Sequence, residues 1–317
     1  MQILITGASG FIGSFLVEEA LKRGFVTYAA VRRSSSKLYL QDERIQFIDL
    51  HYSNPIALAG QLNAFKTEHG AFDYIIHNAG VTKCCNKRDY YTINHVYTKN
   101  LLDALIEADM VPVKFIYMSS LSAWGPGNPK TLEPIRHDDN PCPNTAYGAS
   151  KLKAEVYIKS IERFPYIFLR PTGVYGPREK DYYLINKAVK KGIELSIGFS
   201  PQYLTFIYVR DLVRLTFDII NSPIVQKGYF VTDGHVYTNS EYAAIVKKAL
   251  LKKRTLKIKV PKFLLKVVTG DKYKIISATS WKCETEPLTT DFQFVAEYDL
   301  EKGVEEAIEW YKQEGWL

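Results

Sequence analysis

Short apolar runs alternate with helix-like segments along the first half of the chain. Each run is five to seven residues long and rich in β-branched or aromatic side chains, which is typical of strands. Several of the segments between them repeat apolar residues with the spacing of an amphipathic helix. We expect strands at 2–6, 26–31, 45–50, 73–79, 114–120 and 166–171, and helices at 11–24, 55–65, 94–108 and 150–164.

This alternation predicts an α/β fold. Strands separated by helices of about 10 to 15 residues form β-α-β units, whose parallel sheet is covered on both faces. We therefore expect a Rossmann-type, doubly wound parallel sheet. After Pro171 the pattern changes to Gly-, Pro- and Tyr-rich loops with short helices. We expect a core at 1–171 with returning segments at about 205–235, and a smaller, discontinuous C-terminal region at 172–204 and 236–317.

Composition agrees with a globular protein, since 46% of the 317 residues are apolar and 24% are charged. A formal net charge of +7 is mildly basic for this length and suits an anionic cofactor or substrate. The densest basic run, at 247–262, predicts a solvated helix face followed by a strand. We expect a small-molecule substrate and no nucleic-acid partner.

The four cysteines have neither the spacing of a zinc site nor that of a disulfide framework. The histidines form no cluster with metal-like spacing, so we expect no metal site. The N-terminus leads directly into a strand, and no stretch approaches the roughly 18 uninterrupted apolar residues of a membrane helix. We therefore expect a cytoplasmic protein without a membrane span.

The first β-α turn reads GASGFIG. Glycines at this position permit a tight turn and close backbone approach, and the helix that follows directs its amide groups at a pyrophosphate. This context predicts dinucleotide binding by the 1–171 core. The expected contacts are Gly7, Ser9, Gly10, Phe11, Ile12 and Gly13.

The end of the second strand bears on the choice of cofactor. NAD binders typically place an acidic residue there to hold the ribose 2′-hydroxyl, whereas arginine accommodates a 2′-phosphate. This chain has Arg32 and Arg33 and no acid at that point. The pair therefore favours NADP(H) over NAD(H), although both residues also suit a surface loop.

Tyr147 and Lys151 lie four residues apart, which places them on one face of a helix. A nearby ammonium group lowers the pKa of a phenol, so that the tyrosine can donate or accept a proton at neutral pH. A helix-start aromatic beside a solvated lysine is the structural alternative.

Several ordered motifs now identify a family resemblance. GASGFIG is followed by HNAG at 77–80, YMSSLSAWG at 117–125 and YGASK at 147–151. In this order they resemble the extended short-chain dehydrogenase/reductases, which include nucleotide-sugar epimerases and dehydratases, dihydroflavonol-type reductases and steroid dehydrogenases. The resemblance covers essentially the whole chain. It implies an NAD(P)-dependent oxidoreductase acting on CH–OH and C=O groups, and a homodimer formed through the helix after Tyr147.

The resemblance also implies residue roles. Tyr147 would be the general acid or base, and Lys151 would bind the nicotinamide ribose and lower the pKa of Tyr147. Ser120 would donate a hydrogen bond to the developing oxyanion, and Asn94 would support the site. Further implied cofactor contacts are Asp49, Leu50, Asn78, Ala79, Gly80 and Pro171. The expected substrate contacts are Thr82, Ser122, Trp124, Gly173, Tyr175, Tyr182 and Tyr183.

Three places in the sequence bear on the reaction. Gly173 stands where sugar-nucleotide enzymes of the family commonly carry asparagine, and Leu204 stands where they often carry a diphosphate-binding arginine. Leu121 and Ser122 follow Ser120, where dehydratases tend to have an Asp-Glu pair. The surrounding side chains are aromatic or apolar, although several of them could fill the core of the smaller region instead. They are Trp124, Tyr175, Tyr182, Tyr183, Phe199, Tyr203 and Leu204.

These features lead us to expect an NADP(H)-dependent oxidoreductase that interconverts a hydrophobic ketone and its alcohol, similar to the dihydroflavonol-reductase and steroid-dehydrogenase branches. The alternative is a nucleotide-sugar epimerase or dehydratase with tightly bound NAD. A non-catalytic dinucleotide sensor is a minor alternative, because such proteins tend to lose the tyrosine or the lysine.

Overall fold

A parallel sheet forms the centre of the fold, with six of its strands in residues 2–171 and one at Lys227–Val231. The computed structural model describes residues 1–198, 200–262 and 269–317. Within these residues, seven strands form one sheet in the order β11-β6-β5-β4-β1-β2-β3. The strands are β1 Gln2–Thr6, β2 Val26–Ala30, β3 Gln46–Ile48, β4 Tyr74–His77, β5 Lys114–Met118, β6 Tyr166–Pro171 and β11 Lys227–Val231. The pairings from β3 through β6 are all parallel, which confirms the predicted doubly wound α/β fold.

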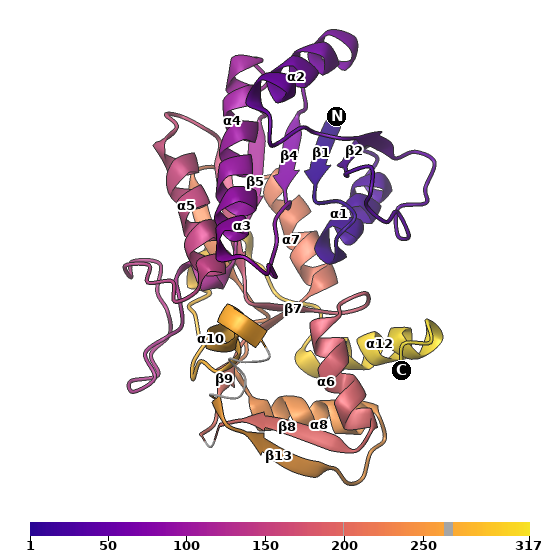
Figure 1. The fold of residues 1–317 in the computed structure, drawn as a ribbon, viewed down its shortest axis with the longest axis vertical. Helices are drawn as coiled ribbons and strands as arrows, with labels where there is room; N and C mark the ends of the chain where they lie inside the picture. The colour runs from indigo at the N-terminus through magenta and orange to yellow at the C-terminus, as the bar shows by residue number, and fades with distance from the viewer. Residues whose placement is uncertain (199, 263–268) are drawn as a thin grey trace. The chain divides into compact units, whose positions relative to one another are not determined.

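Helices cover both faces of this sheet (Figure 1). On one face α2 Pro55–His69, α4 Tyr97–Glu107 and α5 Ala146–Ser160 pack on the strands through a continuous apolar core. On the other face lie α1 Phe11–Lys22 and α7 Val209–Ile220, where the ring of Phe25 contacts that of Phe217 at 5.8 Å. Parallel strands buried on both faces need apolar side chains throughout, as the runs predicted.

Two helices begin earlier than predicted. The helix expected from residue 94 starts with α3 Lys87–Tyr91, because the Asn86 side chain accepts a hydrogen bond from the Arg88 N–H at 2.9 Å. A π-helical turn, Thr92–Val96, joins α3 to α4. Helix α5 starts at Ala146, so that Tyr147 and Lys151 lie on the same helix.

Contacts between residues divide the chain into two units. Unit 1 comprises 1–123, 146–170 and 213–228, and unit 2 comprises 124–145, 171–212 and 229–317. The segment 124–145, which we expected in the core, thus belongs to unit 2. That unit 2 binds the substrate remains a prediction.

The described residues of unit 2 form three strand pairs and several helices. The strands β7 Gly173–Tyr175 and β10 Phe206–Tyr208 pair in parallel, as do β8 Ile193–Ile197 and β13 Leu256–Val260, whereas β9 Tyr203–Leu204 and β12 Tyr237–Thr238 are antiparallel. The helices are α6 Asp181–Lys190, α8 Asn239–Ala249, α10 Tyr273–Ile276, α11 Glu286–Phe292 and α12 Leu300–Gln313. Among the described residues, no helix has the length and apolarity needed to span a membrane.

A buried histidine connects β1, β4 and α4 in unit 1. The imidazole of His77 is 1% exposed. Its Nδ1 lies 2.8 Å from Thr6 Oγ1, and its Nε2 lies 2.9 Å from Thr98 Oγ1. The Thr98 hydroxyl donates to the Asn94 carbonyl, so it accepts from the Nε2–H of a neutral ring, and Thr6 donates to Nδ1. Burial and the nearby Lys151 cation lower the pKa of His77 to about 3.

We expect His77 to make folding sensitive to acid. Because its pKa in the folded state lies below the usual value of about 6.5, the unfolded chain binds the extra proton between these pH values, and stability falls as the pH drops through that window. One such group contributes a slope of about 1.4 kcal/mol per pH unit. Urea unfolding of wild type and His77→Gln from pH 7 to pH 4 measures this slope. Parallel stability curves for the two proteins would contradict the assignment.

Candidate active site

The glycine-rich turn forms a cradle at the carboxyl end of β1. Gly7 has a φ of +64°, and a Cβ there would lie 2.8 Å from the backbone of Ala79. A Cβ on Gly13 would lie 2.1 Å from the Gly7 carbonyl oxygen, so that α1 can approach β1 this closely only without a side chain. Gly10 caps α1 without a side-chain acceptor, which suits a helix N-terminus that binds an anion. The turn therefore fits the pyrophosphate of a dinucleotide.

The other predicted dinucleotide contacts surround the same strand ends. Asn78 donates its side-chain amide to the Gly7 carbonyl at 3.4 Å, and the Ala79 N–H donates to Thr6 at 3.0 Å. Arg32 and Arg33 follow β2 and are exposed. The Arg33 N–H donates to the Asp49 carboxylate at 3.3 Å, and the Arg33 guanidinium lies 4.0 Å from the same carboxylate.

Tyr147 and Ser120, the predicted proton-transfer and oxyanion residues, come close together in unit 1. Tyr147 lies in the first turn of α5, and Ser120 follows β5. The Ser120 hydroxyl accepts the Ser122 N–H at 3.2 Å. Burial raises the pKa of Tyr147 above its usual value, while the nearby Ser120 hydroxyl opposes that shift. The phenol is thus protonated at neutral pH and available as a proton donor.

Lys151 lies one helical turn from Tyr147 and is 4% exposed. Its ammonium group donates to the Met118 carbonyl at 2.8 Å. Burial lowers the pKa of Lys151 to about 8, and the Glu155 carboxylate opposes that shift. We expected Lys151 to lower the pKa of Tyr147, but burial of the phenol dominates and the pKa is raised. The structure therefore shows Lys151 as a buried hydrogen-bond donor, and it does not show Lys151 lowering the pKa of Tyr147.

Asn94 links the site to the loop after β4. It lies in the π-helical turn, fully buried, and its side chain exchanges hydrogen bonds with the backbone of Val81 at 2.8 and 3.1 Å. It also donates to Ser150 on α5 at 3.0 Å. A Cβ on Gly80 would lie 2.9 Å from the Asn94 amide oxygen and 3.1 Å from Lys151 Nζ. Asn94 thus holds Gly80 close to Lys151, as a positioning residue.

A buried ion pair behind the site was not predicted. Ser119 donates to Glu155, whose carboxylate pairs with Arg170 at 2.8 Å, with both charged side chains at most 3% exposed. The sequence contained two signals for this network. Glu155 follows Lys151 by four residues on α5, and Arg170 is a charged residue inside a buried strand, where it requires a partner. Tyr90, whose ring contacts that of Tyr147 at 6.2 Å, was also missed.

Most of the expected substrate residues belong to unit 2, where the structure gives several of them a packing role. Tyr175 is 2% exposed and donates to the Asp299 carbonyl at 3.0 Å, and Tyr183 donates to the Trp316 carbonyl at 2.7 Å. Tyr182 packs against the aromatic core of unit 2, and a Cβ on Gly173 would lie 2.3 Å from its hydroxyl oxygen. Phe199 lies outside the described residues. The substrate role of the set remains a prediction.

Two other expected substrate residues, Thr82 and Ser122, belong to unit 1. Thr82 is exposed in the loop after β4, and its carbonyl accepts the Tyr90 hydroxyl at 3.4 Å. Ser122 is 8% exposed. Leu50 and Pro171, expected near the cofactor, are buried at the ends of β3 and β6.

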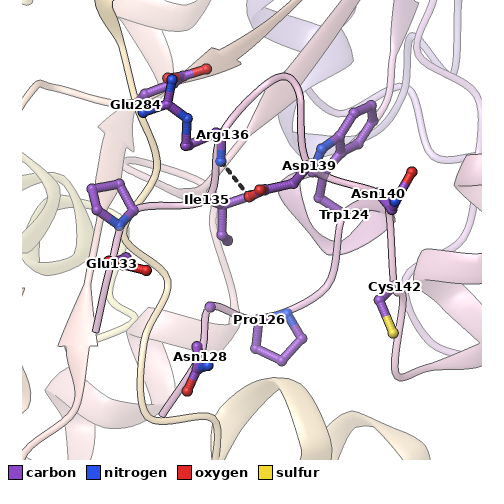
Figure 2. A pocket seen from close by; sticks show the side chains of 12 residues that line it. Trp124, Pro126, Asn128, Glu133, Ile135, Arg136, Asp139, Asn140, Cys142 and Glu284 are labelled. Carbon is purple, nitrogen blue, oxygen red and sulfur yellow. Dashed lines mark hydrogen bonds between the residues drawn. The ribbon is translucent and has the colours of Figure 1, made fainter. Parts of the chain in front are cut away.

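Trp124 lines a pocket of about 590 Å³ within unit 2 (Figure 2). Within the loop that carries both residues, the Arg136 N–H donates to the Asp139 carboxylate at 2.7 Å. Carboxylates, side-chain amides and one guanidinium provide its polar groups: Asn128, Glu133, Arg136, Asp139, Asn140 and Glu284. Such a wall suits a ligand that carries hydroxyl groups.

Comparison with known proteins agrees with the fold and shows the family. The family described as "NAD dependent epimerase/dehydratase family" matches residues 3–229. A UDP-glucose 4-epimerase of Vibrio cholerae is 28% identical over 278 residues, which are 82% of this chain and 79% of that protein. A ceramide reductase of Caulobacter vibrioides is 22% identical over 334 residues, 99% of this chain and 96% of that protein. The structure of a UDP-glucose 4-epimerase of Thermotoga maritima with UDP-glucose shares the fold, with a TM-score of 0.83, 19% identity and 99% coverage of both chains.

Tyr147→Phe removes the proton that the site can transfer and leaves the ring in place. We expect the rate of alcohol–ketone interconversion to fall by about 10²- to 10⁴-fold, with dinucleotide binding retained. Steady-state kinetics and calorimetry with the dinucleotide measure the two properties. Tyr157→Phe, on the same helix, is the matched control and should keep full activity. An active Tyr147→Phe variant would remove Tyr147 from the chemistry and would favour a sensor role.

Ser120 and Ser119 are adjacent, yet we expect opposite consequences when each loses its hydroxyl group. Ser120→Ala should lower kcat by about 10²- to 10³-fold, because a donor to the reacting oxygen is lost. Ser119→Ala should lower the free energy of unfolding by about 1–3 kcal/mol, because the buried Glu155 carboxylate loses a donor, and should change kcat little. Urea unfolding and kinetics of both variants test this separation. Equal effects of the two substitutions on kcat would contradict it.

Proposed function

The chain belongs to the NAD dependent epimerase/dehydratase family and is an oxidoreductase-type enzyme of that family, and on this premise we propose that it epimerises the sugar of a nucleotide sugar. The similarity to the Vibrio cholerae UDP-glucose 4-epimerase supports this substrate class. It was the alternative in our sequence analysis, where a hydrophobic ketone was the main expectation. The proposed cofactor is accordingly NAD.

The observation that carries the proposal is the placement of the Ser120 hydroxyl close to that of Tyr147, with Lys151 buried one turn away. A secondary hydroxyl group placed against this pair can be oxidised once Tyr147 has released its own phenolic proton to solvent, because the phenolate then accepts the proton of the substrate hydroxyl group. Ser120 stabilises the charge that develops on the same oxygen. When bound, the nicotinamide dinucleotide supplies the hydride acceptor and donor. Tyr147 returns the proton when the ketone is reduced on its other face, and the configuration is inverted.

Epimerisation is favoured over dehydration by the residues after Ser120. Elimination of water from the sugar requires a second acid–base pair close to the oxidised carbon. Leu121 and Ser122 follow Ser120 in a short 3-10 turn, and both are buried. Neither side chain can act as a carboxylic acid. A reaction that needs only the Tyr147 proton is consistent with this turn.

A second candidate, NADPH-dependent reduction of a hydrophobic ketone, is favoured by Gly173 and Leu204. The space that an asparagine side chain would need at position 173 is taken by the Tyr182 hydroxyl, and Leu204 packs on the aromatic core of unit 2. Both changes remove polar groups suited to a diphosphate. Arg32 and Arg33 support a 2′-phosphate. The similarity to the Caulobacter ceramide reductase supports this alternative.

One experiment separates the two candidates. The purified protein is supplied with NAD and UDP-glucose, and UDP-galactose is measured by chromatography without added reductant. In parallel it is supplied with NADPH and a series of long-chain ketones, and NADPH consumption is measured. We expect sugar interconversion that Tyr147→Phe abolishes and Tyr157→Phe retains. NADPH consumption with the ketones, together with no change in the UDP-sugars, would replace the epimerase by the reductase.

A further inference from the structure

The two-stranded sheet β8–β13 of unit 2 directs its polar face inward and its apolar face outward. Glu194 on β8 is 4% exposed and accepts from Lys247 on α8 at 3.0 Å, and Ser196 accepts from Asn239 on α8 at 3.3 Å. These contacts place α8 over the Glu194 face. Because successive side chains of a strand alternate, Leu195 lies on the opposite face.

The apolar residues of β13 join Leu195 on that outer face. The register pairs Ile258 with Leu195 and Leu256 with Ile193. Leu195 is 50% exposed, Leu256 is 67% exposed and Ile258 is 39% exposed. A sheet face of a globular protein is normally buried when its side chains are apolar and solvated when they are polar. In the sheet β8–β13 the polar face is covered by α8 and the apolar face is exposed. A contiguous apolar surface therefore remains at the outside of unit 2.

A group of cations surrounds this apolar surface. Lys252, Lys253 and Arg254 precede β13, and Lys262 follows it, and all four are exposed. Among the described residues none of these four has an acidic partner, whereas Lys247 and Lys257 pair with Glu194. The four unpaired cations and the three exposed apolar side chains of β8 and β13 are here called the basic–apolar patch.

The positive charge of the protein is concentrated in this segment. Residues 242–270 contain nine lysines and arginines and no aspartate or glutamate, so that the rest of the chain carries a net charge of −2 against the total of +7. Glu194 and Glu301, from outside the segment, pair with Lys247, Lys248 and Lys257. The remaining excess creates a positive potential around the patch, which attracts anionic partners to this surface.

We propose that the basic–apolar patch binds the surface of an anionic phospholipid membrane. Lysine and arginine near such a surface each add to its attraction, and exposed leucine and isoleucine side chains can enter the boundary between head groups and acyl chains. Nucleic acid would use the cations and would leave the leucines in water. A second copy of the chain would bring two positive surfaces together. A membrane surface would contact both the four cations and the three apolar side chains of the patch.

Edge protection alone does not account for the patch. Lysines on an edge strand prevent other strands from pairing with it, and Lys257 and Lys259 serve that purpose on β13. Protection gives no reason for Leu195, Leu256 and Ile258 to face water. The inference goes beyond the proposed epimerase activity, because it concerns where the enzyme is held and not what it converts.

Vesicle sedimentation of the full chain tests the proposal. The vesicles contain phosphatidylcholine with about 30% phosphatidylglycerol, or phosphatidylcholine alone. We expect binding to the anionic vesicles, weakening at high salt. The triple variant K252E/K253E/R254E should bind at least about 100-fold more weakly, given the contribution of each cation. Activity on the soluble UDP-sugar should be unchanged in the triple variant, which separates this proposal from the proposed function.

Two controls keep the outcome specific. The variant K22E/K130E/R163E changes the net charge equally at exposed residues outside the patch and should keep vesicle binding. The variant L256S/I258S should lose binding, whereas I56S/V295S, with side chains that are 86% and 73% exposed elsewhere, should not. Equal losses in patch and control variants would overturn the proposal. So would tight binding of double-stranded DNA without vesicle binding, or a dimer that L256S/I258S dissociates.

Discussion

The candidate site depends on one buried network of hydrogen bonds centred on His77. The neutral imidazole of His77 joins Thr6 at the end of β1 to Thr98 on α4. Thr6 also receives the Ala79 N–H, and Thr98 donates to the Asn94 carbonyl. Through both Thr6 and Thr98 the network therefore connects to the loop that follows β4, where Gly80 lies against Lys151. If the ring were charged, an additional donor would be buried without an acceptor, so the geometry requires the neutral form.

Two buried cations near this hydrogen-bond network, Arg170 and Lys151, have different partners. Arg170 is neutralised by Glu155, whereas Lys151 donates to a backbone carbonyl and remains close to the same carboxylate without a direct pair. A fully paired lysine would be a poor partner for a ligand hydroxyl group. Separating the two cations leaves Lys151 with donors for a bound molecule and fixes its helix through Glu155. The helix and the strand end that carries Ser119 and Ser120 are thereby held together.

Unit 2 combines an aromatic core with outer surfaces of different character. Phe206 packs in the aromatic core of unit 2, and together with Tyr182 it closes the space at Gly173, which explains why a larger residue is excluded there. The pocket beside Trp124 is polar, and the sheet β8–β13 is apolar and cationic. Aromatic residues in the sequence therefore indicated the core of this unit more directly than they indicated a ligand. Apolar side chains of unit 2 are thus buried in its aromatic core, whereas those on the outer face of the sheet β8–β13 are exposed.

The sequence by itself determined the parallel sheet, the glycine-rich turn and the order of Ser120, Tyr147 and Lys151, because period, spacing and glycine geometry are local properties. It also located the basic segment before β13. Only the tertiary structure decided that Glu155 pairs with Arg170, that burial raises the pKa of Tyr147, and that Tyr175 and Tyr182 pack in a core. These facts depend on contacts between distant segments and on burial. Neither can be read from neighbouring residues along the chain.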